Sequence, residues 1–479
     1  MTPQALNAQS QPDTTKAEVL NEAIVKGVRA QKNAPYAIAN VDRKALQNFS
    51  GTGKELPFLF STTPGVLSWS ENGLGTGTTY MRIRGAGDSR INVTIDGVPL
   101  NSPEDQCVFW ANMNSYSAIL ESAQIQRGVG SSTNGDGAFG GSVALRTKAP
   151  SYDPFVELNA SYGSYNTYNT GFSMSTGLLG NHFVADAAFH TTGTDGYVHG
   201  TAGKSGSWYA GLSWLGRDFI IRYRNIGNYE HTGQAWSGVT AGTGDLSIMD
   251  GTYGKATGIK TYADMYRVGL GRFNSLYESM DPDTYKTTRY TLNDGSYWPK
   301  TTDNFWQDHN ILSAAWDINE SLKTTLSLHY TYGYGYYDEF KSGSKVSKFG
   351  FDMVKSNGKP VTSDFVRQKG LSQNAAGVVY NISYNNNGWD VIGGLSGQMF
   401  RGNHFGYLTY VSNKYVVNHY PGLAGLNDTD FNNGRYTYYD SDATKDDYSA
   451  FVKASKQFGE HFTVFADLQY RHVRYTTDG

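Results

Sequence analysis

The chain has 479 residues, and its 40 basic and 43 acidic side chains leave a formal net charge of −3. This balance lacks the clustered basic excess of nucleic-acid-binding domains, so we expect no nucleic acid as a partner. Gly occurs 56 times and Tyr 35 times, while only 17% of the residues are charged. Many glycines predict many turns, and many tyrosines suit surfaces where one end of a side chain is apolar and the other is wet.

The sequence offers no motif for enzyme chemistry. No Ser/His/Asp set, paired carboxylates or metal-ligand spacing rises above background, so we expect no catalysis, no cofactor and no directly bound metal. Cys107 is the single cysteine, which excludes an intrachain disulfide. Nowhere does the sequence approach the roughly 20 apolar residues that a membrane-spanning helix needs.

Three compositional zones divide the chain. Residues 1–33 are polar apart from a short apolar patch, and they predict a flexible N-terminal arm. Residues 34–150 alternate short β-type runs, such as residues 90–95, with glycine-rich turns and a helical stretch near residues 115–121. That mixture predicts a compact α+β domain.

The third zone, residues 151–479, consists of strand-like segments with alternating faces. In the segment near residues 320–335, Leu326 and Leu328 share one face and Ser327 lies on the other. Alternation with a period of two predicts strands that are buried on one face only. About eleven such segments occur, near residues 155–164, 166–177, 182–192, 205–214, 217–225, 305–317, 320–335, 373–385, 389–403, 446–457 and 460–473.

The connections between these segments alternate in length. Very short links, such as residues 319–320 and 386–388, alternate with long ones at residues 226–304, 336–372 and 404–445. Outer-membrane barrels have short turns on one side of the membrane and long loops on the other. The pattern therefore favours a transmembrane antiparallel β-barrel, and a soluble β-rich binding module is the alternative.

The middle zone carries motifs that resemble the plug domain of TonB-dependent outer-membrane receptors. They stand in the order and at the spacing of that family, and they contain Arg84 and Gly85, Asp96 and Gly97, and Arg127 and Gly128. The resemblance implies a mainly β protein, with an α+β plug inside a transmembrane antiparallel barrel. Such barrels have 22 strands, of which about 11 fall in this chain, so we expect the chain to be a piece of a longer receptor.

Membership of that family would imply active uptake of a scarce ligand across the outer membrane of a Gram-negative cell, in contact with its lipid. The form of the third motif, Arg127-Gly128, resembles siderophore, metal-chelate and vitamin receptors more than glycan importers. We therefore expect a ferric siderophore or a similar metal chelate as the extracellular ligand. A glycan or vitamin receptor, and a passive porin-like channel, are the alternatives.

The apolar patch of the arm aligns with the TonB box of the family. Its residues are Glu22, Ala23, Ile24, Val25, Lys26, Gly27 and Val28. The resemblance implies that this segment adds as a strand to a TonB-type energy-transducing complex of the inner membrane. An ordinary first strand of the plug is the alternative.

The resemblance also implies contacts within the receptor and with its ligand. Arg84 and Arg127 are expected to pair with carboxylates of the barrel and so to hold the plug in place. His231, Trp236 and His404 lie in or beside the long connections, and they are the candidate ligand-binding residues.

Overall fold

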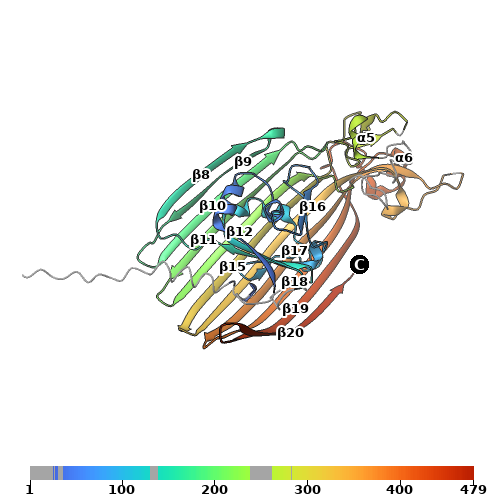
Figure 1. Ribbon diagram of the computed structural model, residues 1–479. Coiled ribbons are helices and arrows are strands. Elements are labelled where there is room, and N and C mark those ends of the chain that lie inside the picture. Colours follow the sequence, from blue (N-terminus) through green and yellow to red (C-terminus); the bar gives the residue numbers. More distant parts are fainter. Residues whose placement is uncertain are drawn as a thin grey trace, which may run out of the picture.

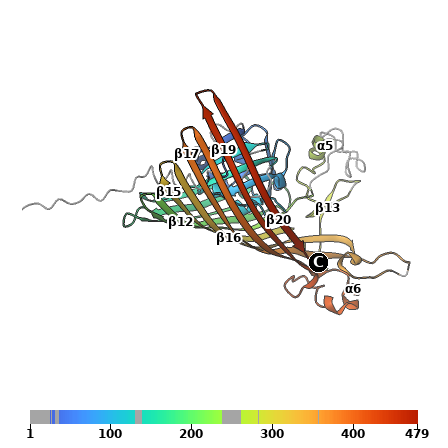
Figure 2. The same ribbon diagram turned by 90° about the horizontal axis from the view of Figure 1, so that it is seen from below.

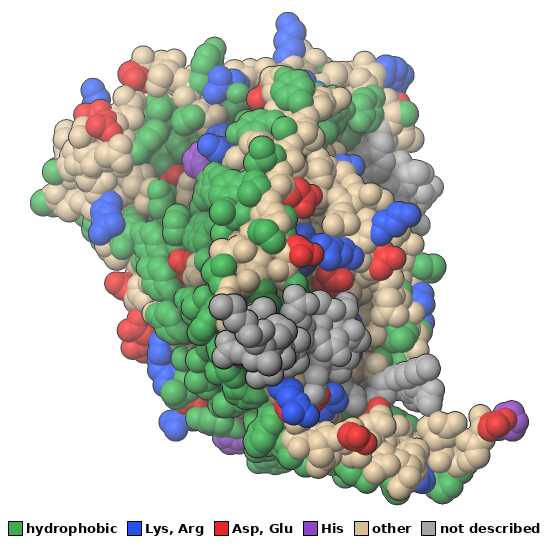
Figure 3. All heavy atoms as spheres, turned by 90° about the vertical axis from the view of Figure 1, so that its left-hand side faces the viewer, with side chains coloured by type: hydrophobic (Ala, Val, Ile, Leu, Met, Phe, Trp, Pro, Cys, Tyr) green, Lys and Arg blue, Asp and Glu red, His purple; other side chains and the backbone are tan. Residues whose placement is uncertain are grey.

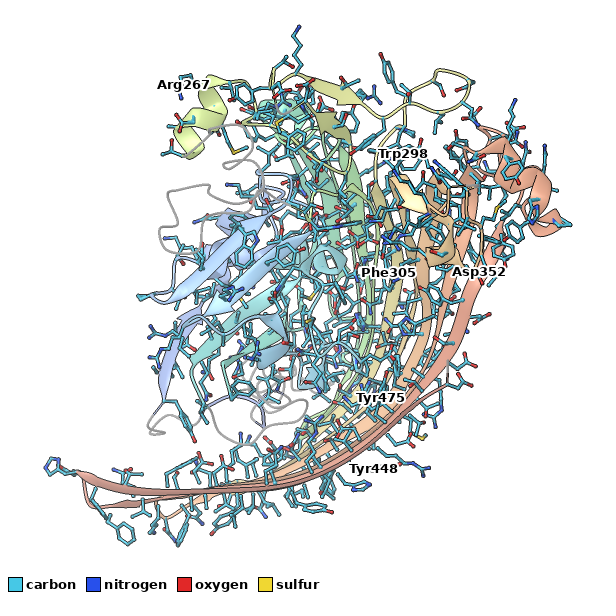
Figure 4. All side chains as sticks on the ribbon, turned by 90° about the vertical axis from the view of Figure 1, so that its right-hand side faces the viewer. Arg267, Trp298, Phe305, Asp352, Tyr448 and Tyr475 are labelled. Atoms are coloured by element: carbon cyan, nitrogen blue, oxygen red, sulfur yellow. The ribbon has the colours of Figure 1, made fainter. Side chains whose placement is uncertain are left out.

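We describe a computed structural model of the chain. In it a small α+β domain packs against the concave side of a large curved sheet (Figures 1 and 4). Among the residues that the structure describes, no helix is long and apolar enough to cross a membrane. These residues are 25, 27–30, 36–129, 139–237, 261–281, 283–355 and 357–478.

The small domain, hereafter the plug, is built on a five-stranded sheet with the order β1-β6-β7-β4-β5. Its strands are β1 (Ala37–Val41), β4 (Ile91–Ile95), β5 (Val98–Pro99), β6 (Leu120–Arg127) and β7 (Gly141–Thr147). The pair β4 and β7 is parallel, and the other neighbours are antiparallel. A separate hairpin joins β2 (Val66–Ser70) to β3 (Thr79–Ile83).

Short helices cover this sheet. They are α2 (Arg43–Ser50), α3 (Leu56–Phe60), and the 3-10 turns η1 (Asp88–Arg90), η2 (Trp110–Met113) and η3 (Tyr116–Ala118). The Asp42 side chain caps α2 by accepting a hydrogen bond from the backbone N–H of Ala45 at 2.9 Å. Where the sequence predicts a helix near residues 115–121, the structure has the single 3-10 turn η3, and β6 begins shortly after it.

The large sheet has eleven strands, and each pairs with its neighbour in chain order. They are β8 (Pro154–Tyr162), β9 (Tyr168–Thr176), β10 (Phe183–Thr194), β11 (Gly203–Leu215), β12 (Phe219–Gly233), β15 (Thr302–Asn319), β16 (Leu322–Lys345), β17 (Thr362–Asn386), β18 (Trp389–Val411), β19 (Tyr436–Phe458) and β20 (Phe462–Thr477). The expected count of eleven antiparallel strands is confirmed.

The short elements of the long connections gather at one end of this sheet (Figure 2). They include α5 (Tyr262–Arg267), α6 (Lys414–His419), β13 (Glu278–Met280), β14 (Thr287–Arg289), and the 3-10 turns η5 (Val346–Phe349) and η6 (Pro421–Leu423). The short connection between β8 and β9 contains one further 3-10 turn, η4 (Ser164–Asn166). Several strands run further toward this end than the alternation predicts: β12 continues to Gly233 and β16 to Lys345. We call this end the long-loop end.

The two faces of the sheet differ as the alternation predicts. On β16, Leu326 is 41% exposed on the outer face, whereas its neighbour Ser327 is 4% exposed on the inner face. Figure 3 shows hydrophobic side chains gathered in a broad band along one side of the molecule. Ser327 shares a 2.9 Å hydrogen bond with Ser313 on β15, and both are buried. The inner face there is therefore dry and packed, although its side chains are polar.

Neighbouring residues on β18 test this assignment of faces. Met399 is 51% exposed on the outer face, and Gln398 is half-buried on the inner face opposite Asp447 of β19. We expect Met399→Arg to cost roughly 2–4 kcal/mol, because it places a charge against lipid. Gln398→Arg places its charge on the polar inner face, beside the ion pair that Asp447 forms with Arg471, and should cost less than the change at Met399. The measurement is the yield of heat-modifiable, membrane-assembled protein, and a reversed order would contradict the register.

Candidate functional site

A buried ion pair ties the plug to the sheet. Asp96 follows β4 and is 1% exposed, and its carboxylate contacts the guanidinium of Arg224 on β12, which is 0% exposed. Thr147 donates two hydrogen bonds to the same carboxylate, from its backbone N–H at 2.9 Å and from its hydroxyl at 2.6 Å. Asp96 and Gly97 both have positive φ, which explains the Asp-Gly pair at this tight β4–β5 turn.

The charges around Asp96 keep it ionised. Burial raises the pKa of Asp96, but the cations Arg224 and Arg222 and the hydrogen bonds from Thr147 lower it further than burial raises it. The pKa therefore lies below the usual range of an aspartate. Arg222 lies beside this pair and donates to the backbone carbonyl of Lys148 at 2.8 Å. Polar side chains from β7, from β12 and from the turn after β4 thus meet at one buried position.

The plug motif arginines lie elsewhere. Arg127 donates to the backbone carbonyl of Pro64 at 2.8 Å, and the backbone N–H of Arg84 donates to Gly65 at 2.7 Å. Both arginines therefore brace the loop before β2. Within the described part of the chain neither forms an ion pair, so their pairing with barrel carboxylates stays a prediction.

The glycines that follow these arginines have positive φ. The φ of Gly85 is 85° and that of Gly128 is 95°, a conformation that glycine adopts at little cost. The Arg84 side chain also lies close to Gly128, where a Cβ atom would meet its guanidinium at 3.1 Å. Each Arg-Gly pair therefore forms a turn at the same corner of the plug.

Two adjoining cavities lie between the plug and the sheet, toward the long-loop end. The larger has a volume of about 440 Å³ and the smaller about 300 Å³. Both are lined by Val108 and Phe109 from the plug, and by Glu230, Asp303 and Tyr337 from the sheet. A molecule in either cavity would touch both parts of the protein at once.

A fixed plug loop, residues 100–109, forms the floor shared by these cavities. The Asn101 side chain accepts a hydrogen bond from the N–H of Val93 at 2.7 Å and donates to the carbonyls of Ile91 and Gln106, each at 2.8 Å. It therefore fastens the loop directly to β4. Phe109 is left exposed at the end of this loop, facing the cavities.

The three candidate ligand residues occupy different places. Trp236 lines the larger cavity and meets Tyr337 edge-to-face, with 5.3 Å between ring centroids. His404 lines the smaller cavity, and its Nε2 lies 2.6 Å from a carboxylate oxygen of Glu104 in the plug. His231 lies on the outer face of β12, where its ring contacts Asn304. Two of the three residues thus line a cavity, each a different one.

The cavities also contain residues that the sequence analysis missed. Phe305, labelled in Figure 4, lines the smaller cavity, and Glu71 from the β2–β3 loop lines the larger one. Burial raises the pKa of Glu71, against the opposing hydrogen bonds from Tyr80 and Ala235. The strand predicted for residues 217–225 was too short. If its alternation had been continued, Glu230 would have been placed on the inner face and His231 on the outer face.

The N-terminal patch is only partly described. Glu22, Ala23, Ile24 and Lys26 lie outside the described residues. Val25 and Val28 are buried in a cluster with Ala144 of β7, and the N–H of Val28 donates to the carbonyl of Val25 at 3.1 Å. Lys453 on β19 donates to the carbonyl of Gly27 at 2.6 Å. The described part of the patch is therefore a turn docked between plug and sheet.

Comparisons with known proteins agree with this architecture. The family model for the TonB-dependent Receptor Plug Domain matches residues 30–142. A search of curated proteins finds no match. The chain carries the plug domain of TonB-dependent receptors, followed by eleven strands of the barrel fold that goes with it.

Solved structures of siderophore receptors share this fold. The ferric-catecholate import receptor Fiu from E. coli K12 has 14% identity and a TM-score of 0.63, over 93% of this chain and 60% of its own. FpvA of P. aeruginosa, bound to pyoverdine, has 14% identity and a TM-score of 0.61, over 94% and 52%. FyuA, the ferric yersiniabactin uptake receptor of Yersinia pestis, has 12% identity and a TM-score of 0.60, over 95% and 59%. This chain therefore spans between one half and three fifths of these receptors.

The ion pair at Asp96 yields a prediction about stability. Arg224→Met leaves a buried, unpaired carboxylate, so we expect a loss of roughly 3–5 kcal/mol in the free energy of unfolding. Asp96→Asn fits the left-handed backbone, and the double variant should recover part of the loss. Urea unfolding in lipid vesicles measures this, and strictly additive losses would show that the two residues do not interact.

The same pair predicts how stability depends on pH. The pKa of Asp96 is depressed in the folded protein, so its contribution is complete above the unfolded pKa of about 3.9 and is lost as the pH falls through the lower folded value. Asp96→Asn should therefore unfold with a shallower dependence on pH below about 4. If the free energy of unfolding of Asp96→Asn falls with pH as steeply as that of the unmodified chain, ionised Asp96 is not the source of this dependence.

Proposed function

We propose that this protein takes up a ferric siderophore, or a similar iron chelate, across the outer membrane of a Gram-negative cell in a TonB-dependent manner. The observation that carries the proposal is the pair of cavities at the long-loop end, bounded by the plug and the sheet together. Receptors of the same fold are named for ferric siderophores. The cavities combine aromatic side chains with a few polar groups, as small-molecule sites do.

The plug provides a continuous path from these cavities to the N-terminal patch. Loop 100–109 is fastened to β4 by Asn101, and β4 pairs in parallel with β7. Ala144 of β7 packs against Val25 and Val28. A ligand that shifts the loop therefore acts on the strands against which the patch is docked. The patch then has two states, docked and released, and such a pair of states is what coupling between distant sites requires.

The released patch would be the binding strand for a TonB-type complex in the inner membrane. Energy from that complex then displaces the plug and opens the barrel, without any covalent chemistry. A passive channel needs neither a docked patch nor a plug that fills the inner face. The burial of polar inner-face residues such as Arg222 and Ser313 under the plug favours gated uptake.

The ligand site is tested with two tyrosines of β16. Tyr337 lines both cavities, whereas Tyr332 is exposed on the outer face. We expect Tyr337→Ala to weaken binding of a ferric chelate roughly tenfold or more, because the lost ring is an aromatic contact in a concave site. Tyr332→Ala is the matched control and should bind normally. Quenching of tryptophan fluorescence by a panel of ferric siderophores measures both, and equal effects would place the site elsewhere.

Energy coupling is tested at the patch. We expect Val25→Pro to abolish energised uptake, because proline removes a backbone donor from the strand that joins the partner. Val25→Ala keeps that donor and should retain most uptake. Binding at the long-loop end should stay near normal in both variants, as measured with radiolabelled ferric chelate in intact cells. Uptake that persists in the proline variant would mean that the patch is not the TonB box.

A further inference from the structure

Three carboxylates from three different elements meet in the larger cavity. Glu71 comes from the plug, Glu230 from β12 and Asp303 from β15. Glu230 pairs across the strands with Phe305, so Asp303, two residues along the same face, is its diagonal neighbour. The three carboxylates lie close enough to repel one another when they are ionised.

Among the described residues, these carboxylates receive hydrogen bonds but form no ion pair. Glu71 accepts from the Tyr80 hydroxyl at 2.6 Å and from the N–H of Ala235 at 2.7 Å. Glu230, which is 6% exposed, accepts one hydrogen bond from the Thr232 hydroxyl at 3.2 Å, to one of its two oxygens. Over the described ranges, none of the three carboxylates forms an ion pair.

The cations that line the same cavity are already engaged. Arg367 donates to Glu339 through its Nε at 2.9 Å and its Nη2 at 2.6 Å, and Lys341 forms an ion pair with the same carboxylate. Glu339 is thereby neutralised at the edge of the cavity. Two cations on one carboxylate leave a single positive charge at this edge. The lining also holds Glu71, Asp88, Glu230 and Asp303, so its net charge is negative when these four are ionised.

Aromatic rings complete the lining. Tyr80 and Phe109 contribute from the plug, and Trp236 and Tyr337 from the sheet side. Aromatic faces attract organic cations, and the attraction grows when water is excluded. No group of His, Cys, Asp and Glu in the described residues has the arrangement to hold a bare metal ion. The lining therefore suits an ammonium or guanidinium group better than a metal ion.

We propose that the larger cavity recognises a cationic group on the ligand, so that the preferred iron chelate carries an ammonium or guanidinium arm. The cation contacts Glu71, Glu230 and Asp303, and the aromatic rings enclose it. A cation placed among the three carboxylates offsets their mutual repulsion and favours their ionised forms. This inference rests on the proposed uptake of an iron chelate and specifies the chemical class of that chelate.

Two forms of one chelate provide the test. Ferrioxamine B carries a free terminal ammonium group, and its N-acetylated form has the same iron centre without that charge. With the full chain in detergent, we expect the ammonium form to bind roughly ten- to hundredfold more tightly, the range for a hydrogen-bonded charge. Glu230→Gln should bring the two affinities close together, because it weakens binding of the ammonium form far more than binding of the acetylated form.

Further variants separate a site effect from misfolding or bulk charge. Glu71→Gln should also reduce the ratio of the two affinities, that of the ammonium form to that of the acetylated form. The neighbours of Glu71 differ from those of Glu230, so a shared folding defect would not explain both results. Asp428→Asn removes an exposed carboxylate from the long connection 412–435, outside the cavity, and should leave the ratio as it is in the unmodified chain. Heat-modifiable mobility on gels reports whether each variant is folded, and only folded variants enter the comparison.

The remaining outcomes overturn one proposal or both. Equal binding of the two ferrioxamine forms by the unmodified chain would refute the cationic site. Tight binding of an anionic ferric tris-catecholate, with weak binding of both ferrioxamine forms, would also refute it while leaving iron-chelate uptake intact. Failure of all three chelates to bind would overturn the proposed function, and the cationic site with it.

Discussion

On the strands that the plug covers, the inner sheet face is polar and yet largely buried, and this is the constraint on which the structure depends. Arg222, Arg224 and Lys453 point inward from the strands and are almost fully buried. Buried polar groups are costly unless they are hydrogen-bonded or paired, so each needs a partner. The plug supplies them through the carboxylate of Asp96 and through backbone carbonyls, including that of Gly27. Plug and sheet are therefore specified together.

The same constraint ties the ligand cavities to the coupling segment. The Asp96 turn ends β4, and the loop fastened to that strand by Asn101 forms the cavity floor. β7, the parallel neighbour of β4 in the same sheet, carries Ala144, against which Val25 and Val28 pack. A short plug sheet thus connects a binding surface at one end with a docked chain segment at the other.

Much of the barrel followed from the alternation of side chains, because lipid on one face and plug on the other impose a strict period of two. Leu326 and Ser327 fall on the faces that this period predicts. The ends of the strands could not be predicted from the alternation. Beyond the lipid both faces of a strand meet polar surroundings, so the period of two is lost, as in residues 338–345 of β16. His231 was placed in a loop for this reason, although β12 continues through it and turns it outward.

The contacts between distant elements were beyond the sequence analysis. An arginine within a strand signals that it has a partner but not which one, so the Asp96–Arg224 pair appeared only in three dimensions. The hydrogen bond from Arg127 to the carbonyl of Pro64, within the plug, also joins residues that are far apart in the chain. Similarly, the acidic character of the larger cavity arises from Glu71, Glu230 and Asp303, which are far apart in the chain and share no local motif.

The long connections at residues 346–361 and 412–435 share an apolar cluster of their own, which includes Phe349, Val416 and Leu423. Separating them would expose this surface to water, at about 25 cal/mol for each Å². The two connections are therefore held together as one folded body at the long-loop end. A molecule that approaches the cavities from this side meets a packed surface and not two independent loops.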